Sequence, residues 1–283
     1  MNDSHPSRRF FFKTVALSGL AFSGVPGLSF SPGPAGAQTA KMKHWDVIVL
    51  GGGPGGVPAA VAAARNGARV LLVERYGFLG GMATAALVLP YMKFFTGGTF
   101  IVRGLFEEFI DLMEKNGAVR NLFNVGGRPT RTCYDDEPMK RLLDRFVLDS
   151  GAEMLLHSQA VGVLRSGNTV RAVKVFHKGG IEDLSADVFV DSTGDGDIAA
   201  WAGAKVEVGR DAPDHFCQPM TSCFRMAGVD KSRIPDGKEI NRLYDEAKSR
   251  GEVKNPRENV LKFDTVHADV VHFNTTRVVG ESA

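Results

Sequence analysis

Residues 51–56 read Gly-Gly-Gly-Pro-Gly-Gly and stand between an apolar strand candidate and an alanine-rich helix candidate. We expect the strand from Trp45 to Leu50 and the helix from Val57 to Asn66, because Gly67 follows in a position that favours a helix C-terminus. A second β-branched run, Arg69 to Glu74, completes a βαβ unit of about thirty residues. This start constrains the chain to an α/β fold.

The glycine spacing predicts a dinucleotide-binding turn. Gly51 permits the tight turn, Gly53 lets the backbone approach a pyrophosphate, and Gly56 lets helix and strand pack closely. Together with Pro54 and Gly55, these residues open the helix, whose free amides and partial positive charge favour phosphates.

Glu74 ends the second strand, where a carboxylate is placed to accept hydrogen bonds from ribose hydroxyls. Its negative charge disfavours a 2′-phosphate, so NADP is the least expected occupant. We include the neighbouring Arg75 among the expected cofactor contacts. FAD and NAD share this fingerprint, so these residues alone leave both open.

Two further segments separate the two cofactors: Gly-Gly-Met-Ala-Thr at 80–84 and Asp-Ser-Thr-Gly-Asp-Gly-Asp at 191–197. With them the sequence resembles the FAD-dependent oxidoreductase family related to the glutathione reductase and fumarate reductase flavoproteins, from about Trp45 to the end of the chain. The resemblance implies non-covalently held FAD. It also implies cofactor contacts, which would be Gly80, Gly81, Thr84, Thr193, Gly194 and Asp195. For the second segment, a Gly and Asp turn that caps a helix is the alternative.

The rest of the pattern predicts helices over 102–116, 137–149 and 237–249. It also predicts an antiparallel meander of strands over 153–156, 160–164 and 170–176, a return strand over 186–191 and a later strand over 269–273. The resemblance implies a Rossmann-like, glutathione reductase type three-layer fold, in which Val161 contacts the adenine. The expected division is a FAD-binding domain over 44–204, with a helical insertion at 100–150 and a β-meander at 160–186, and a partial mixed α+β substrate domain over 205–283.

The expected activity is hydride transfer between a small polar organic substrate and flavin, with an unknown electron acceptor. His272 is the candidate base and Arg277 the candidate carboxylate clamp, within a stretch that resembles a recurring segment of the bacterial branch of the family. Strand alternation places the two on opposite faces, which favours a half-solvated strand instead. An NAD-dependent dehydrogenase and a non-catalytic binding protein are the alternatives.

The first 37 residues read as a leader, and Ser7 to Lys13 resembles a twin-arginine export signal. We therefore expect the export machinery as a partner and a periplasmic or extracellular location. The apolar stretch from Val15 to Phe30 is too rich in Gly and Ser for a stable membrane anchor.

The chain's net charge of +2 disappears without the leader, which excludes a nucleic-acid footprint. Three cysteines without C-x-x-C spacing indicate no metal site.

The sequence stops at Ala283 without the final Gly-Asp segment that the resemblance implies. We therefore expect a truncated chain or a fragment of a longer protein.

Overall fold

The structure, a computed structural model, describes residues 44–92, 94–96, 99–122, 124–125 and 127–280. These residues belong to one compact unit. The predicted leader lies outside the described residues. Within them, no helix combines the length and the apolar composition needed to cross a membrane.

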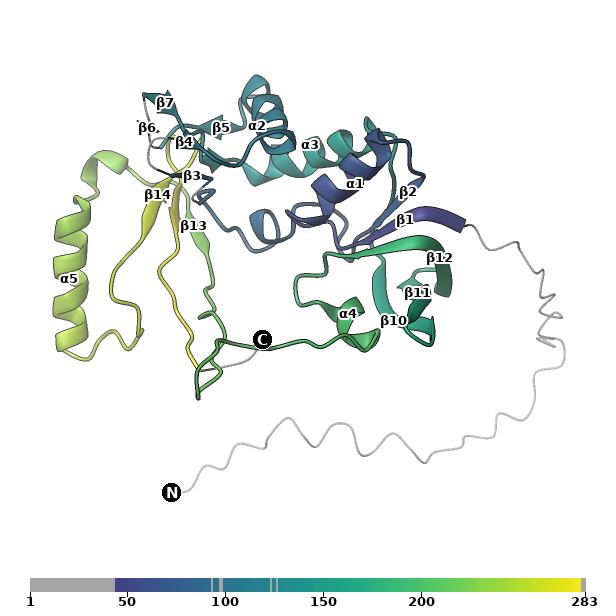
Figure 1. The fold of residues 1–283 in the computed structure, drawn as a ribbon. Coiled ribbons are helices and arrows are strands. Elements are labelled where there is room, and N and C mark those ends of the chain that lie inside the picture. The colour runs from purple at the N-terminus through teal and green to yellow at the C-terminus, as the bar shows by residue number, and fades with distance from the viewer. Residues whose placement is uncertain (1–43, 93, 97–98, 123, 126, 281–283) are drawn as a thin grey trace, which may run out of the picture. The chain divides into compact units, whose positions relative to one another are not determined.

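Residues 44–191 contribute six strands to one sheet, in which three strand pairings are parallel and two are antiparallel. The strand that begins the fold, β1, has a parallel neighbour on each side (Figure 1). In spatial order the strands are β10 (Gln159–Ser166), β11 (Thr169–His177), β12 (Gly180–Asp191), β1 (His44–Leu50), β2 (Val70–Val73) and β9 (Glu153–Leu155).

Two strands differ from the sequence expectation. β12 is continuous, because Ser185 pairs with Ala172 of the meander on one side and with His44 of β1 on the other. Residues 180–185, where no strand was expected, and the predicted return strand over 186–191 are therefore one element. β9 was expected in the antiparallel meander, but it pairs parallel with β2. The reason is that a helix crosses over immediately before β9 and returns the chain in the direction of β2.

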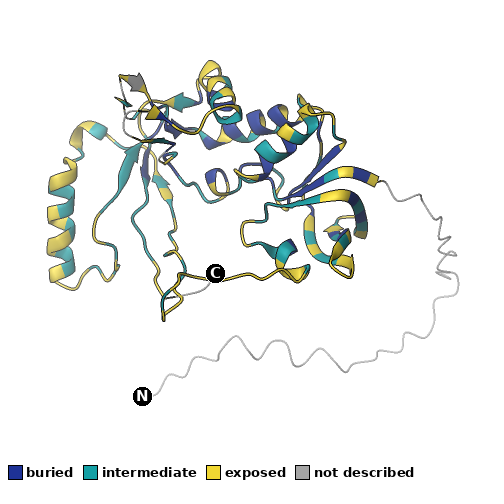
Figure 2. Ribbon diagram, viewed as in Figure 1, coloured by how far each residue is buried: buried dark blue, intermediate teal, exposed yellow. Residues whose placement is uncertain are grey.

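Three helices cover one face of the sheet, and their apolar sides form the larger core with residues such as Val49 and Leu72 (Figure 2). They are α1 (Gly56–Arg65), α2 (Leu105–Lys115) and α3 (Asp136–Leu148). All three were predicted, although α2 starts later than expected because Gly104, at a φ of 68°, turns the chain just before it.

The opposite face of the sheet carries a second core. Trp45, Ile48 and Leu50 of β1 pack with Val173 and Val175 of β11, and the short helix α4 (Asp197–Trp201) adds to it. β11 and β1 belong to the same six-stranded sheet, on either side of β12, so this core lies on the second face of that sheet.

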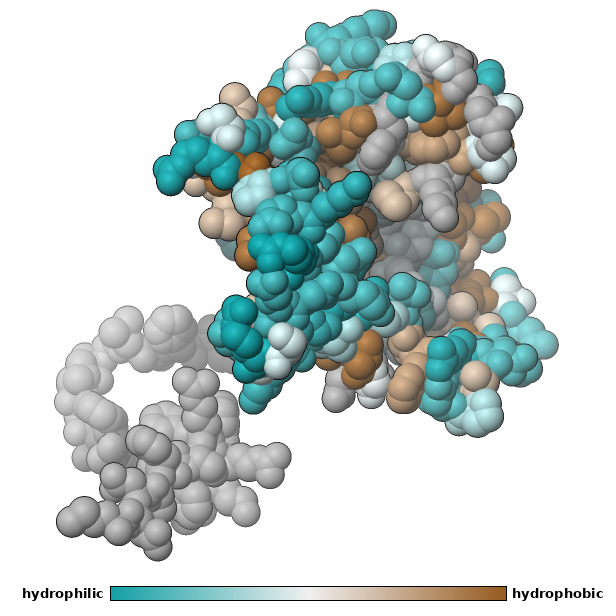
Figure 3. Space-filling model, turned by 90° about the vertical axis from the view of Figure 1, so that its left-hand side faces the viewer, coloured by the Kyte–Doolittle hydropathy of each residue, from teal (hydrophilic) through white to brown (hydrophobic). Residues whose placement is uncertain are grey.

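A separate three-stranded antiparallel sheet follows, with β15 (Val271–Phe273) between β13 (Phe224–Met226) and β14 (Lys262–Asp264). Helix α5 (Gly237–Ser249), as predicted, begins after Asp236, whose side chain accepts hydrogen bonds from two first-turn amides. No residue of α5 is buried, and the side of the molecule that carries it is broadly hydrophilic (Figure 3).

Short elements connect these parts. They are β3 (Phe95–Thr96), β4 (Thr99–Phe100), β5 (Val119–Arg120), β6 (Asn124–Val125), β7 (Arg128–Pro129), β8 (Cys133–Tyr134) and the 3-10 turns η2 (Gly81–Ala83) and η3 (Lys231–Arg233).

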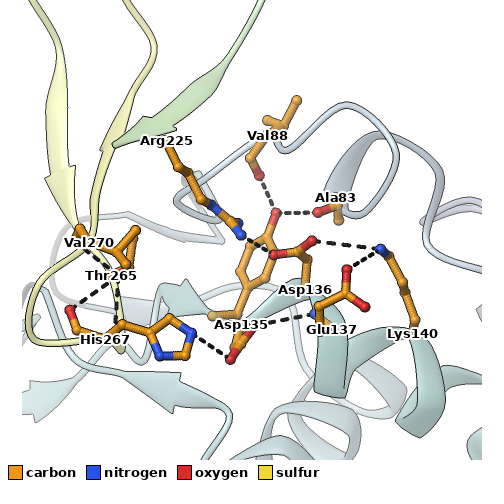
Figure 4. A network of polar contacts seen from close by, with 11 residues as sticks. Ala83, Val88, Asp135, Asp136, Glu137, Lys140, Arg225, Thr265, His267 and Val270 are labelled. Carbon is orange, nitrogen blue, oxygen red and sulfur yellow. Dashed lines mark hydrogen bonds and ion pairs between the residues drawn. The ribbon is translucent and has the colours of Figure 1, made fainter. Parts of the chain in front are cut away.

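A polar network joins the three-stranded sheet to the start of α3 (Figure 4). Arg225 of β13 donates to the buried carboxylate of Asp136, and His267 lies 3.0 Å from Asp135. Asp135 in turn accepts a hydrogen bond from the amide of Glu137 and caps the helix. The same side chains therefore start α3 and hold the second sheet against it.

The Asp136→Asn substitution should lower the free energy of unfolding by about 3 kcal/mol, because it leaves the Arg225 guanidinium without its buried counter-charge. The matched control is Asp149→Asn at the other end of α3, where an exposed pair with Arg145 should contribute less than about 0.5 kcal/mol. Urea unfolding measures both. Equal losses in the two variants would show that the Asp136 pair is no more than a surface contact.

His272 of β15 is fully buried, and neither ring nitrogen has a hydrogen-bond partner in the described structure. Burial, together with the nearby Arg225, lowers its pKa from 6.5 to about 4, although Asp136 opposes the shift. Stability should therefore be greatest above pH 6.5 and should fall towards pH 4, because the unfolded chain binds the proton first. The loss from this group is about 3 kcal/mol. In His272→Leu the fall measured between pH 7 and 4 should be smaller by that amount, and an unchanged pH profile would refute the assignment.

Candidate functional site

Three segments meet where β1, β2 and β12 end, at the carboxyl edge of the parallel strands, which is where open α/β sheets bind ligands. A Cβ on Gly51 would lie 2.2 Å from the carbonyl oxygen of Ser192, and one on Gly81 would lie 2.9 Å from Cα of Gly53. The amide of Gly80 donates to the carbonyl of Gly52 at 2.8 Å. The structure thus brings together the three segments predicted from the sequence, 51–56, 80–84 and 191–197.

The glycines of the turn have different physical roles. Gly51 has a φ of 102° and touches Ser192, whereas a Cβ on Gly56 would lie 1.8 Å from the Gly51 carbonyl oxygen. Both are needed for the chain to pack against itself. At Gly53 an added Cβ would meet nothing nearer than Gly81 at 3.8 Å. The backbone at Gly53 therefore faces space that a ligand can enter.

The N-terminus of α1 has no side-chain cap and no acidic residue in its first turn. Pro54 and Gly55 are exposed there. The first amides of a helix lack partners within the helix and carry its positive dipole end. This end of α1 therefore offers N–H donors and a positive potential to an anion.

Glu74, directly after β2, is 6% exposed. Its two carboxylate oxygens accept hydrogen bonds from the amide of Gly52 at 2.6 Å and from the amide of Tyr76 at 2.8 Å. A carboxylate has about four acceptor positions, so about two remain. No Lys, Arg or His in the described part of the chain forms an ion pair with Glu74. The carboxylate is thus fixed beside the glycine turn with acceptor capacity left for hydroxyl groups.

The chain returns to Glu74 just before the meander. The amide of Ser158 donates to the carbonyl of Glu74 at 2.9 Å, and β10 starts at the next residue. Val161 lies near the start of this strand and is 43% exposed. Arg75 is exposed, with its guanidinium 4.9 Å from the centre of the Tyr76 ring. An adenine contact by Val161 and a cofactor contact by Arg75 stay predictions.

The hydroxyls of the two predicted threonines have partners within the protein. Thr84 is 2% exposed and donates to the carbonyl of Leu79 at 2.7 Å. Thr193 donates to Asp191 at 2.7 Å and accepts at 3.0 Å from the amide of Asp197, the first residue of α4. The Thr193 hydroxyl thus bonds within the turn before α4, whereas Gly194 and Asp195 are exposed beside it. Cofactor contacts from these residues stay predictions.

The candidate catalytic residues lie elsewhere. His272 is buried in the second sheet, and Arg277 donates to both carboxylate oxygens of Glu258 at 3.0 and 2.8 Å. Neither lines the cavity next to the glycine turn. Their catalytic roles stay predictions without a contact to this site.

A cavity of about 440 Å³ adjoins the turn, and its walls include Gly53, Pro54 and Gly80. The remaining wall is mostly aromatic and aliphatic residues from α1, α2, α3 and the loops between β2 and α2, with Tyr91 and Arg103 as the polar members. Sequence reasoning did not identify these wall residues as part of a site. The irregular apolar stretch over 76–98, which is typical of a loop packed over a ligand, was the available signal.

Comparison with known proteins agrees with this geometry. The family model for FAD dependent oxidoreductase matches residues 46–280. Digeranylgeranylglycerophospholipid reductases are among the similar curated proteins. The one from Thermoplasma volcanium is 26% identical over 176 residues, which cover 58% of this chain and 43% of the relative. The soluble pyridine nucleotide transhydrogenase of Yersinia enterocolitica is 51% identical over 47 residues, 17% of this chain and 10% of the relative.

The chain spans less than half the length of these curated relatives. Among solved structures, a flavin-dependent brominase is similar at a TM-score of 0.50 and 14% identity, covering 82% of this chain and 55% of that one. CabE, an aromatic hydroxylase from angucycline biosynthesis, also has a TM-score of 0.50, at 19% identity, covering 83% of this chain and 45% of that one. These two likenesses show the fold alone. With the family model matching nearly all of the described residues, the chain belongs to the FAD dependent oxidoreductase family, whose cofactor is FAD.

Proposed function

We propose that this chain is the FAD-binding part of an oxidoreductase that exchanges hydride between an organic substrate and flavin. The observation that carries the proposal is the uncapped N-terminus of α1 beside the buried carboxylate of Glu74. An anion site and a hydroxyl acceptor thus flank one glycine turn. The antiparallel meander of β10, β11 and β12, which joins the parallel strands through β12, supports a glutathione reductase type of fold.

The residues present fit the cofactor. The free amides of the first turn of α1, at Gly55 and Gly56, would hold the pyrophosphate, and the open backbone at Gly53 would let it approach. Glu74 would accept hydrogen bonds from the adenosine ribose. Bound FAD supplies the hydride chemistry, so the protein has to bind it, orient the substrate and exclude water.

The substrate and the electron acceptor are small molecules in this proposal, and residues 205–283 contribute to a substrate domain. The similar curated proteins include named reductases, which supports hydride transfer as the reaction class. A small polar substrate was expected from the sequence. The apolar walls of the cavity beside Gly53 favour a substrate with an apolar part instead.

Glu74→Gln should weaken FAD binding by about tenfold to a hundredfold, because hydrogen bonds to a charged group contribute about 1.5–3 kcal/mol each. Glutamine also brings an NH2 group towards the amides of Gly52 or Tyr76, so the substitution could disorder the glycine turn as well as remove the ribose contact. FMN distinguishes these two effects, because it lacks the adenosine ribose and responds only to disorder of the turn. Fluorescence titration of the apoprotein should show weaker FAD binding with FMN binding retained.

The control variant is Glu182→Gln, an exposed glutamate on β12, which should leave the affinity for both flavins unchanged. An equal loss of FAD and FMN affinity in Glu74→Gln would refute the ribose contact. Unchanged FAD affinity would refute the proposed site itself.

We also propose that the protein is exported in the folded state by the twin-arginine route, on the basis of Arg8 and Arg9 in the leader. Replacing both with lysine should keep the protein in the cytoplasm of a host that has this machinery, whereas Lys13→Arg should still be exported. Immunoblots of cytoplasmic and periplasmic fractions measure the distribution. Equal export of the double variant would contradict the proposal.

A further inference from the structure

We propose that the cavity beside the glycine turn binds the apolar body of the substrate, and that this substrate is an organic anion whose charged group pairs with Arg103. The inference rests on the proposed function, because it assigns a substrate class to the same site. Three features of the cavity support the inference: its apolar walls, the residues at its entrance, and its place next to the cofactor-binding segments.

The walls of the cavity are apolar almost throughout. Side chains from three helices and from the loop after β2 converge on about 440 Å³, within the range of small-molecule sites. They include Val57 of α1, Phe106 and Phe109 of α2, and Met139, Leu143 and Phe146 of α3. A space with these walls gains free energy when an apolar ligand displaces water from it.

The rim also exposes apolar side chains. Met82 is 61% exposed, Met92 is 67% exposed and Val102 is 45% exposed, and all three line the cavity. Methionine adapts its shape to ligands, because its unbranched chain has several rotatable bonds. These three residues therefore extend the apolar surface from the interior to the entrance.

Two polar side chains at the cavity can orient a bound ligand. The Tyr91 hydroxyl has Met139 Sδ as its partner at 3.4 Å, and a thioether is a weak acceptor that a ligand oxygen can replace. Burial raises the pKa of this phenol, so the hydroxyl stays protonated and can donate. Arg103 is the one charged residue among the described residues that line the cavity.

Arg103 is exposed, and its Nε donates to the carbonyl of Phe100 at 3.2 Å. No carboxylate from the described residues forms an ion pair with it. The remaining N–H groups of the guanidinium can therefore bind a carboxylate or phosphate of a ligand whose body enters the cavity.

The cavity lies beside the cofactor residues. Gly53, Pro54 and Gly80 belong both to its wall and to the segments assigned to the pyrophosphate. A molecule in the cavity is thus held next to the dinucleotide.

The test uses the full chain saturated with FAD and titrates it with octanoate, decanoate and decanol by isothermal calorimetry. Decanoate should bind more tightly than octanoate by about fourfold per methylene. Arg103→Gln should weaken decanoate binding about three- to fivefold and leave decanol unchanged. Its control, Arg145→Gln on the exposed side of α3, should change neither.

A second variant tests whether the ligand occupies the cavity itself. Leu105→Trp, at the start of α2 in the cavity wall, should narrow the space and weaken binding of both decanoate and decanol. Leu148→Trp is its control, because Leu148 is 55% exposed at the end of α3 and lies outside the wall.

Absence of decanoate binding by protein that retains FAD overturns the inference and leaves the proposed function standing. Binding to FAD-free protein that is lost on saturation with FAD also overturns it, because the cofactor then occupies the cavity. Unaltered decanoate binding in Leu105→Trp places the ligand elsewhere and refutes the site. Failure of the unmodified protein to bind FAD refutes the proposed function, and the inference falls with it.

Discussion

The structure depends on a close approach of three backbones, where β1 turns into α1 beneath the segment that follows β12. Gly51 lies under the carbonyl of Ser192, and Gly56 lies against the carbonyl of Gly51, so neither position has room for a Cβ. This contact lets α1 start immediately after the strand, with its N-terminal amides at the edge of the sheet. It also places the loop at Gly80 beside the turn, since the amide of Gly80 bonds to Gly52. The candidate cofactor site is a consequence of this packing.

The sequence predicted most of the longer helices. α1 followed from its alanine-rich run and from Gly67, α2 and α3 followed from apolar periodicity, and α5 was expected over 237–249. Pairing between distant strands was not predictable in the same way. The parallel partnership of β9 with β2 and the continuity of β12 depend on how the chain crosses the sheet, and no local pattern encodes that.

In the candidate site, too, local sequence patterns predicted some residues, and only the packing of the chain reveals the others. The glycine turn and Glu74 were predicted because each follows a strand whose carboxyl end reaches one edge of the sheet. The segments at 80–84 and 191–197 were expected from the resemblance to FAD-dependent oxidoreductases. The cavity was not predicted, since Tyr91, Arg103 and Phe146 are brought together only by the packing of the helices. The burial of His272 likewise results from the contact between the second sheet and α3, which involves Asp136 and Arg225.

The central claim is that a dinucleotide pyrophosphate binds the amides at the N-terminus of α1. Protein labelled with ¹⁵N-glycine reports these amides directly in a heteronuclear NMR spectrum. The account predicts that FAD, and ADP as its pyrophosphate-bearing half, shift the signals of Gly53, Gly55 and Gly56 and leave Gly237 at the start of α5 in place. Saturation with FAD that moves other glycine signals but not those three would contradict it.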